Sequence, residues 1–150
     1  MKNTIIFDLD GTLADINARR ILATKSNGKL DWNKFFDPDN IKLDIPNDRV
    51  IKMAQLFAED GFNIVIFSGR SDGTINTTKS WLVRNKIPFH RLVMRDKDRL
   101  FMPDDQLKKQ FLDEHLDIDD VFLVVDDRQK VVDMWRSLGL KVFQVDDGNF

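Results

Sequence analysis

The stretch TIIFDLDGT, residues 4–12, joins a short apolar run to two acidic residues and a glycine. The β-branched and aromatic side chains of residues 4–7 favour a buried strand. Because alternate residues of an extended chain point to the same side, the Asp8 and Asp10 carboxylates can meet one ligand. Gly11 can adopt backbone angles closed to other residues, so the chain can turn sharply under a bound anion. We therefore predict a strand that ends in a ligand site, with a plain Asp-Gly turn as the alternative.

Four other apolar runs follow along the chain, and between them apolar residues recur at the i, i+3, i+4 spacing of helices. Near-continuous apolar strands that alternate with helices are typical of a parallel sheet covered on both faces. We therefore predict an α/β fold with a doubly wound (Rossmann-like) five-stranded parallel sheet. The expected strands are residues 4–7, 63–67, 91–94, 121–125 and 141–145, and the expected helices lie near residues 50–58, 74–82, 107–112 and 131–138.

Residues 11–46 interrupt this alternation, because they show no sustained periodicity. Long irregular segments inside compact domains usually serve function. We expect residues 13–46 to form a flap or small cap over the carboxyl edge of the sheet, where doubly wound sheets bind ligands. Its aromatic cluster of Trp32, Phe35 and Phe36 can either pack the flap on the body or stack on a nucleic-acid base. We expect residues 1–150 to form one domain that includes this insertion.

The composition excludes several classes of protein. The 150-residue chain has no cysteine, so it has no disulfide, thiol nucleophile or thiolate metal site. Its formal net charge of -2 argues against a broadly basic nucleic-acid-binding protein, although it allows a local basic site. The longest apolar runs are too short to span a bilayer, and no cationic leader precedes the first strand. We therefore expect a cytoplasmic protein with no membrane partner.

Polar residues also follow the second and fourth expected strands. Ser68-Gly69-Arg70 offers a hydroxyl, backbone amides and a guanidinium, all of which can bind phosphate oxygens. The adjacent carboxylates of Asp126 and Asp127 repel each other unless solvent or a cation neutralises them. This pair therefore predicts either a metal site or the N-cap of the next helix.

Asp104 and Lys108 lie four residues apart at the start of an expected helix, after Pro103. At that spacing the carboxylate can cap the helix and pair with the ammonium. Such pairs are common on protein surfaces without any function, so a surface ion pair is the alternative to a role in the site.

The order of these groups along the chain is more specific than any of them alone. An acidic pair, a hydroxyl, a lysine and a second acidic pair follow one another at or near strand ends. In this order the sequence resembles the haloacid dehalogenase superfamily, through DLDGT at residues 8–12, Ser68, Lys108 and the pair Asp126-Asp127. The resemblance covers essentially the whole chain. It implies a phosphatase that uses Mg2+ and forms a phosphorylated aspartate.

A narrower resemblance is to the 3′-phosphatase domain of bacteriophage polynucleotide kinase. It implies removal of a 3′-phosphate from a DNA or RNA end. Residues 21–46 depart most from that family's pattern, so a phosphatase of nucleotides or sugar phosphates is the alternative. The matching positions are DLDGTLA at residues 8–14 with Asn17 and Arg19, SGR at 68–70 with Gly73 and Thr74, Asp104 and Asp105 ahead of Lys108, DDRQKVVDMWR at 126–136, then Gly139, Val145 and GNF at 148–150.

The resemblance implies a role for each matching residue. Asp8 would attack phosphorus, Asp10 would protonate the leaving oxygen and then activate water, and Lys108 would stabilise the transferred phosphoryl group. Whether Asp126 or Asp127 binds the metal directly is left open. The implied Mg2+ ligands are Asp8, Asp10, Asp126 and Asp127, and the implied substrate or phosphate contacts are Thr12, Arg19, Ser68, Gly69, Arg70, Asp104 and Arg128.

The kinase activity of that family lies in a separate domain with a phosphate-binding loop. Residues 73–80 resemble such a loop only superficially, because Thr78 stands in place of its second glycine. We interpret residues 74–81 as the start of a helix, so a kinase or ligase partner would act in trans.

Four arginines favour a nucleic-acid end as the substrate, because they would supply more positive charge near the predicted site than one phosphate needs. A receiver-type signalling domain is also phosphorylated on aspartate, but its acceptor normally follows a later strand than the first. The sequence predicts no oligomeric state. The four arginines are Arg19, Arg70, Arg95 and Arg99.

Overall fold

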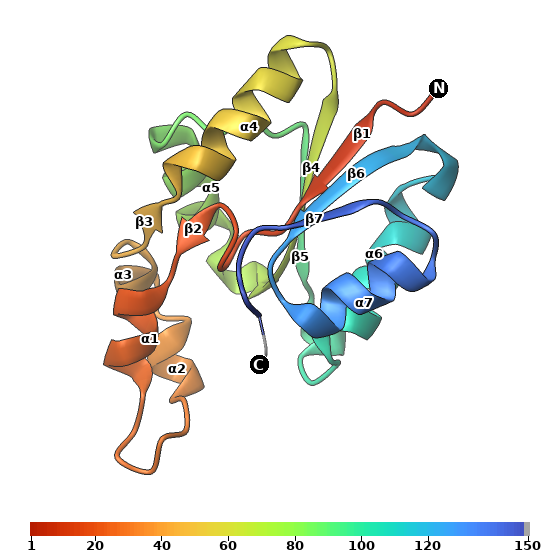
Figure 1. The fold of residues 1–150 in the computed structure, drawn as a ribbon. Coiled ribbons are helices and arrows are strands. Elements are labelled where there is room, and N and C mark those ends of the chain that lie inside the picture. The colour runs from red at the N-terminus through yellow and green to blue at the C-terminus, as the bar shows by residue number, and fades with distance from the viewer. Residues whose placement is uncertain (149–150) are drawn as a thin grey trace.

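Five parallel strands form the central sheet of the computed structural model, which describes residues 1–148 (Figure 1). Their order is β5-β4-β1-β6-β7, so β1 lies in the middle and the chain builds outward from it in both directions. This arrangement confirms the predicted doubly wound α/β fold and places residues that follow β1 where such sheets bind ligands. The strands are β1 (Thr4–Phe7), β4 (Asn63–Ser71), β5 (Arg91–Arg95), β6 (Val121–Asp126) and β7 (Val142–Gln144).

Helices cover both faces of the sheet, as predicted (Figure 1). The helices α4 (Asp48–Glu59) and α5 (Ile75–Arg84) pack on one face, and α6 (Asp104–His115) and α7 (Gln129–Ser137) pack on the other. None of the helices found within residues 1–148 has the length and apolar character needed to cross a bilayer. The described part of the chain also has three short 3₁₀ turns: η1 (Asp72–Thr74), η2 (Lys97–Arg99) and η3 (Ile118–Asp120).

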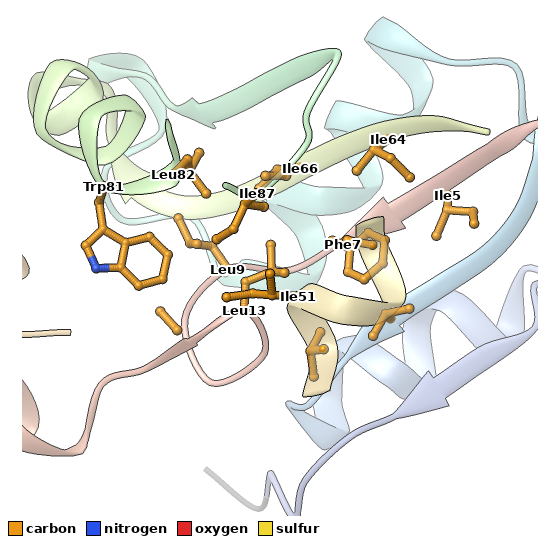
Figure 2. Close-up of a cluster of buried hydrophobic side chains, with 14 of the residues drawn as sticks. Ile5, Phe7, Leu9, Leu13, Ile51, Ile64, Ile66, Trp81, Leu82 and Ile87 are labelled. Atoms are coloured by element: carbon orange, nitrogen blue, oxygen red, sulfur yellow. The ribbon is translucent and has the colours of Figure 1, made fainter. Parts of the chain in front are cut away.

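The strand β1 shows why its apolar run is continuous. Ile5 and Phe7 point into the core under α4 and α5, where Leu82 also packs (Figure 2). Ile6 points to the opposite core, under α6 and α7. Because successive strand residues face opposite ways, a strand buried on both sides must be apolar at every position.

Four strands differ in length from the prediction, and two of them, β5 and β6, differ only by one added residue, Arg95 and Asp126. The strand β4 continues past the apolar run to Ser71, because a register shift after Ser68 lets Ser71 pair with Arg95 of β5. The strand β7 is shorter than expected and ends at Gln144. In β4 the residues after Phe67 are polar or glycine, so they give no apolar signal for a strand, although the backbone continues to pair there.

The segment between β1 and α4, hereafter the cap (residues 14–46), is the part least well predicted. The short strands β2 (Ala14–Asp15) and β3 (Ile45–Pro46) pair antiparallel at its base. Between them lie three helices that were not predicted, because helices of one or two turns are too short to show periodicity. The helices are α1 (Asn17–Ala23), α2 (Trp32–Phe35) and α3 (Pro38–Ile41).

Replacing Leu82 with alanine should lower the free energy of unfolding by about 2–5 kcal/mol, because it removes a fully buried side chain from the core. Val83 is its neighbour on α5 but is 67% exposed, so Val83→Ala should change that free energy by less than about 0.5 kcal/mol. Urea unfolding in the absence of Mg2+ measures both. Equal losses in the two variants would contradict the packing of α5.

Candidate active site

The chain turns tightly after β1 and brings the first acidic residues to the sheet edge. The Leu9 carbonyl accepts hydrogen bonds from the amides of Thr12, Leu13 and Ala14. Gly11 has a φ of 84°, in the left-handed region that favours glycine. A Cβ atom there would also overlap the Asp127 carboxylate. The turn therefore requires glycine both for its backbone angle and for its contact with the end of β6.

Three carboxylates and one ammonium meet at this turn. Lys108 of α6 donates from Nζ to Asp8 Oδ1 at 2.6 Å and to Asp126 Oδ2 at 3.2 Å. The Thr12 hydroxyl lies 3.0 Å from Asp8 Oδ2 and 3.2 Å from Asp127 Oδ1. Oxygens of Asp8, Asp126 and Asp127 lie within 4.8 Å of one another, and all three residues are buried. The structure thus brings together the two acidic strand ends and the lysine.

The charges in this cluster do not balance. Burial raises the pKa of Asp8 well above its ordinary value, the Asp126 charge adds to the rise, and Lys108 offsets part of it. Burial likewise raises the pKa of Asp127. Burial alone would lower the pKa of Lys108, but Asp126 and Asp8 outweigh it and raise that pKa.

A divalent cation fits this imbalance. When all three carboxylates are ionised, they exceed the Lys108 charge by two negative charges, which one divalent cation would neutralise. The donors are all oxygens, the ligands that hard cations prefer. The three carboxylates therefore form a candidate metal site rather than a simple helix cap.

Asp10 lies in a second, separate group of charges. Its Oδ1 accepts from Arg19 Nη2 at 2.8 Å and from Arg70 Nε at 2.9 Å and Nη2 at 2.5 Å. Burial alone would raise the pKa of Asp10, but Arg70 and Arg19 outweigh it and lower that pKa to about 2. Both arginine side chains are fully buried.

Asp44, at the end of the cap, was not found from the sequence. It also binds Arg19 and Arg70, and its backbone carbonyl accepts from Trp81 Nε1. Burial raises the pKa of Asp44 to about 6, although the two arginines act to lower it. Its neighbours in the sequence form no motif, and the apolar residues on either side of it, Leu43 and Ile45, are themselves exposed, so the sequence gives no signal for this residue.

A third group lies beside the end of β4. The Asp104 carboxylate accepts from Arg95 Nη2 at 2.6 Å and from Arg128 Nη1 at 2.7 Å. A Cβ atom on Gly69 would lie 2.8 Å from Asp104 Oδ1, so glycine allows this close approach. The Ser68 hydroxyl accepts from the Arg70 amide at 3.1 Å. Asp104 therefore links the ends of β4, β5 and β6.

The expectation of surplus positive charge from four arginines is wrong. Arg19 and Arg70 pair with Asp10 and Asp44, while Arg95 pairs with Asp104. Arg99 pairs with Asp96, which precedes η2, and with Glu114 of α6. The sequence shows where basic residues occur but not which carboxylates neutralise them. Contact of Arg19 and Arg70 with a substrate phosphate stays a prediction.

Comparison with known proteins identifies the family. A family model described as the polynucleotide kinase PNKP phosphatase domain matches residues 2–150. This chain belongs to that family. The match confirms the resemblance to a polynucleotide kinase phosphatase domain of the haloacid dehalogenase superfamily, and the protein is a phosphatase.

Solved structures agree with the assignment to this phosphatase family. The chain is 29% identical to a chain of a Pnkp1/Rnl/Hen1 complex (TM-score 0.81) and covers 100% of itself and 48% of that chain. It is also 29% identical to a chain of a Pnkp1/Rnl/Hen1 RNA repair complex, with a TM-score of 0.82. That match covers 99% of this chain and 44% of the other. The phosphatase chain thus spans less than half of either relative. The class C acid phosphatase of Bacillus anthracis shares its fold, with 16% identity, a TM-score of 0.67 and coverage of 99% and 68%.

The raised pKa values of Asp8 and Asp127 predict how pH acts on stability. Without metal, the folded protein holds protons that the unfolded chain loses near the ordinary value of 3.8, so the free energy of unfolding should fall as pH rises above that value. Mg2+ binds ionised carboxylates, so the increase in Tm that it causes should grow from about pH 5 to about pH 7.5. Thermal melts in EDTA and in Mg2+ measure both effects.

Asp127→Asn removes one of the crowded charges and one candidate ligand. Its Tm in EDTA should be less sensitive to pH, and its Mg2+ shift should be smaller than that of the unchanged protein. Asp133→Asn, at an exposed position of α7, is the matched control and should behave like the unchanged protein. Equal Mg2+ shifts in the Asp127→Asn variant and the unchanged protein would argue against a metal ligand at Asp127.

Proposed function

We propose that this protein is a Mg2+-dependent phosphatase that removes 3′-phosphates from DNA or RNA ends through a phosphorylated Asp8. The observation that carries the proposal is the buried Asp8 carboxylate held by Lys108 beside two further carboxylates, in a chain of the PNKP phosphatase family. A fixed anionic nucleophile next to a cation site is what attack on a phosphate dianion requires.

The hydrogen bonds favour Asp127 over Asp126 as the direct metal ligand. Asp126 Oδ2 already accepts from Lys108 and Trp135, and its Oδ1 accepts from the Asp127 amide. The Asp127 carboxylate faces Thr12 and Gly11 and is less engaged. We infer that the Asp8 carboxylate, the Asp10 carbonyl and Asp127 would hold Mg2+, while Asp126 positions Lys108. Mg2+ would supply charge neutralisation that lets one anion approach another.

The reaction would proceed in two displacements at phosphorus. In the first, an Asp8 oxygen bonds to phosphorus, the bond to the leaving oxygen breaks, and that oxygen takes the proton of the Asp10 carboxylic acid. In the second, Asp10 accepts a proton from water, the water oxygen bonds to phosphorus, and the bond between phosphorus and the Asp8 oxygen breaks, which restores the Asp8 carboxylate and releases inorganic phosphate. Lys108, Ser68 and the Gly69 amide would stabilise the phosphoryl oxygens.

The low pKa of Asp10 suits the second displacement better than the first. Arg70 and Arg19 hold Asp10 ionised, which is the form that accepts a proton from water. Donation in the first displacement needs the protonated form. A phosphate dianion brought beside Asp10 raises its pKa through like-charge repulsion, so the bound substrate itself promotes protonation.

The cap supplies positive charge that the arginines of the site do not. The cap as a whole, residues 14–46, contains six basic and five acidic residues, so its net charge is +1 against -2 for the whole chain. Lys25, Lys29 and Lys34 are exposed on this segment. A polynucleotide carries phosphates beyond the one that is cleaved, and these could pair with the cap lysines. A small-molecule phosphatase has no such need, so this charge favours the nucleic-acid substrate.

A kinase or ligase acting in trans completes the proposal. Removal of a 3′-phosphate leaves a 3′-hydroxyl, the group that joining to a 5′-phosphate requires. The relatives of similar fold occur in Pnkp1/Rnl/Hen1 complexes, one of them described as an RNA repair complex. We infer a partner activity of that class for this phosphatase.

Asp8→Asn should abolish turnover, because the amide cannot form the phosphorylated intermediate. Asp10→Asn should slow turnover about 10²- to 10⁴-fold, the usual contribution of a general acid-base. Phosphate release from a 3′-phosphorylated oligonucleotide in Mg2+ measures both. Turnover of the Asp8 variant near that of the unchanged protein would disprove the mechanism.

An oligonucleotide 3′-phosphate should have a lower KM than a nucleoside 3′-phosphate, and the difference should shrink as salt rises. Replacing Lys25, Lys29 and Lys34 together with alanine should raise KM for the oligonucleotide and leave KM for the nucleoside unchanged. A 5′-phosphorylated oligonucleotide and a sugar phosphate complete the panel. Equal KM values for both 3′-phosphates at low salt would favour the small-molecule phosphatase instead.

A further inference from the structure

Asp44 is a buried acidic residue that the mechanism above does not use. It lies directly before β3, where the cap returns to the body, and its side chain is fully buried. Its Oδ1 accepts from Arg19 Nε at 3.0 Å, and its Oδ2 accepts from Arg19 Nη2 at 3.0 Å and Arg70 Nη2 at 2.8 Å. One carboxylate thus holds two arginines that come from different parts of the chain.

The same two arginines hold the general acid-base. Arg19 and Arg70 donate to a single oxygen of Asp10, its Oδ1. This arrangement leaves Oδ2 as the oxygen that can carry the proton to the leaving group. The direction of that oxygen depends on where the two guanidiniums lie.

Other contacts anchor the far sides of the guanidiniums. Arg19 Nη1 donates to the Phe35 carbonyl at 3.0 Å, and its guanidinium lies 4.4 Å from the centre of the Phe35 ring. Arg70 Nη1 donates to the Thr78 hydroxyl at 3.2 Å. These neutral partners fix position but do not balance charge. Without Asp44, two buried cations would share one carboxylate, which is unfavourable in a buried site.

We propose that Asp44 is a positioning residue for Asp10. It fixes Arg19 and Arg70 so that Asp10 Oδ2 is directed at the leaving oxygen of the substrate. Asp44 and Arg19 belong to the cap, whereas Arg70 lies near the end of β4 and Asp10 follows β1. This placement therefore depends on the cap lying against the sheet edge. The inference rests on the proposed role of Asp10 as general acid.

Leaving-group dependence separates this role from a general loss of structure. Phenyl phosphate releases a phenol with a pKa of about 10, as in tyrosine, so its departure needs a proton from Asp10. The far more acidic nitrophenol leaves p-nitrophenyl phosphate with little help. A misplaced general acid therefore slows the first ester much more than the second, whereas a disordered site slows both.

The experiment is rapid-quench measurement of phenol release in the first turnover, in Mg2+, for both esters. Asp44→Asn should slow release from phenyl phosphate by roughly 10- to 100-fold, a part of what a general acid contributes, and from p-nitrophenyl phosphate by less than about 3-fold. Asp10→Asn should show the same selectivity. Asp39→Asn, an exposed cap residue paired with Lys42, is the charge-matched control and should leave both rates unchanged.

Thermal melting checks that each variant is folded. If Asp44→Asn is not, Asp44→Glu keeps the charge that the arginines need but displaces the carboxylate by one methylene, and it should show the same selectivity. Equal slowing of both esters in a folded Asp44 variant would overturn the proposal. If Asp10→Asn also shows no selectivity, the general acid itself is wrongly assigned. Neither outcome bears on the 3′-end preference, which the oligonucleotide panel tests separately.

Discussion

The crowding of three buried carboxylates around one lysine is the constraint on which this active site depends. Two parallel strands, β1 and β6, end side by side, so Asp8 and the pair Asp126-Asp127 cannot avoid one another. Lys108 offsets one charge only. The remaining negative charge makes the site a candidate for a divalent cation, next to the carboxylate that we propose as the nucleophile.

A second group of charges, separate from the first, links the cap to Asp10. It consists of Arg19, Arg70, Asp10 and Asp44. Two arginines and two carboxylates balance there, so this group needs no cation. The two acidic residues of the turn after β1 therefore have different surroundings: the pKa of Asp8 is raised and the pKa of Asp10 is lowered. Environments that separate two carboxyl groups in this way are typical of a nucleophile and an acid-base with distinct tasks.

The sheet and the acidic strand ends could be predicted from the sequence, because burial on both faces requires apolar runs and parallel strands end at one edge. The cap helices could not, since they are too short to show periodicity. Asp44 was missed because a single acid before a two-residue strand has no motif. Arg19 and Arg70 were identified as site residues, but the carboxylates they pair with depend on tertiary contacts between the cap and the sheet, which no local pattern encodes.

The central claim is that phosphate passes through a covalent bond to Asp8. Mass spectrometry of peptides from acid-quenched reactions, with a 3′-phosphorylated oligonucleotide and Mg2+, tests it most directly. The account predicts phosphate on the peptide that contains Asp8, in a form cleaved by hydroxylamine, during turnover and not after the substrate is exhausted. Release of inorganic phosphate in the first turnover with no adduct on that peptide, or an adduct on another residue, would contradict it.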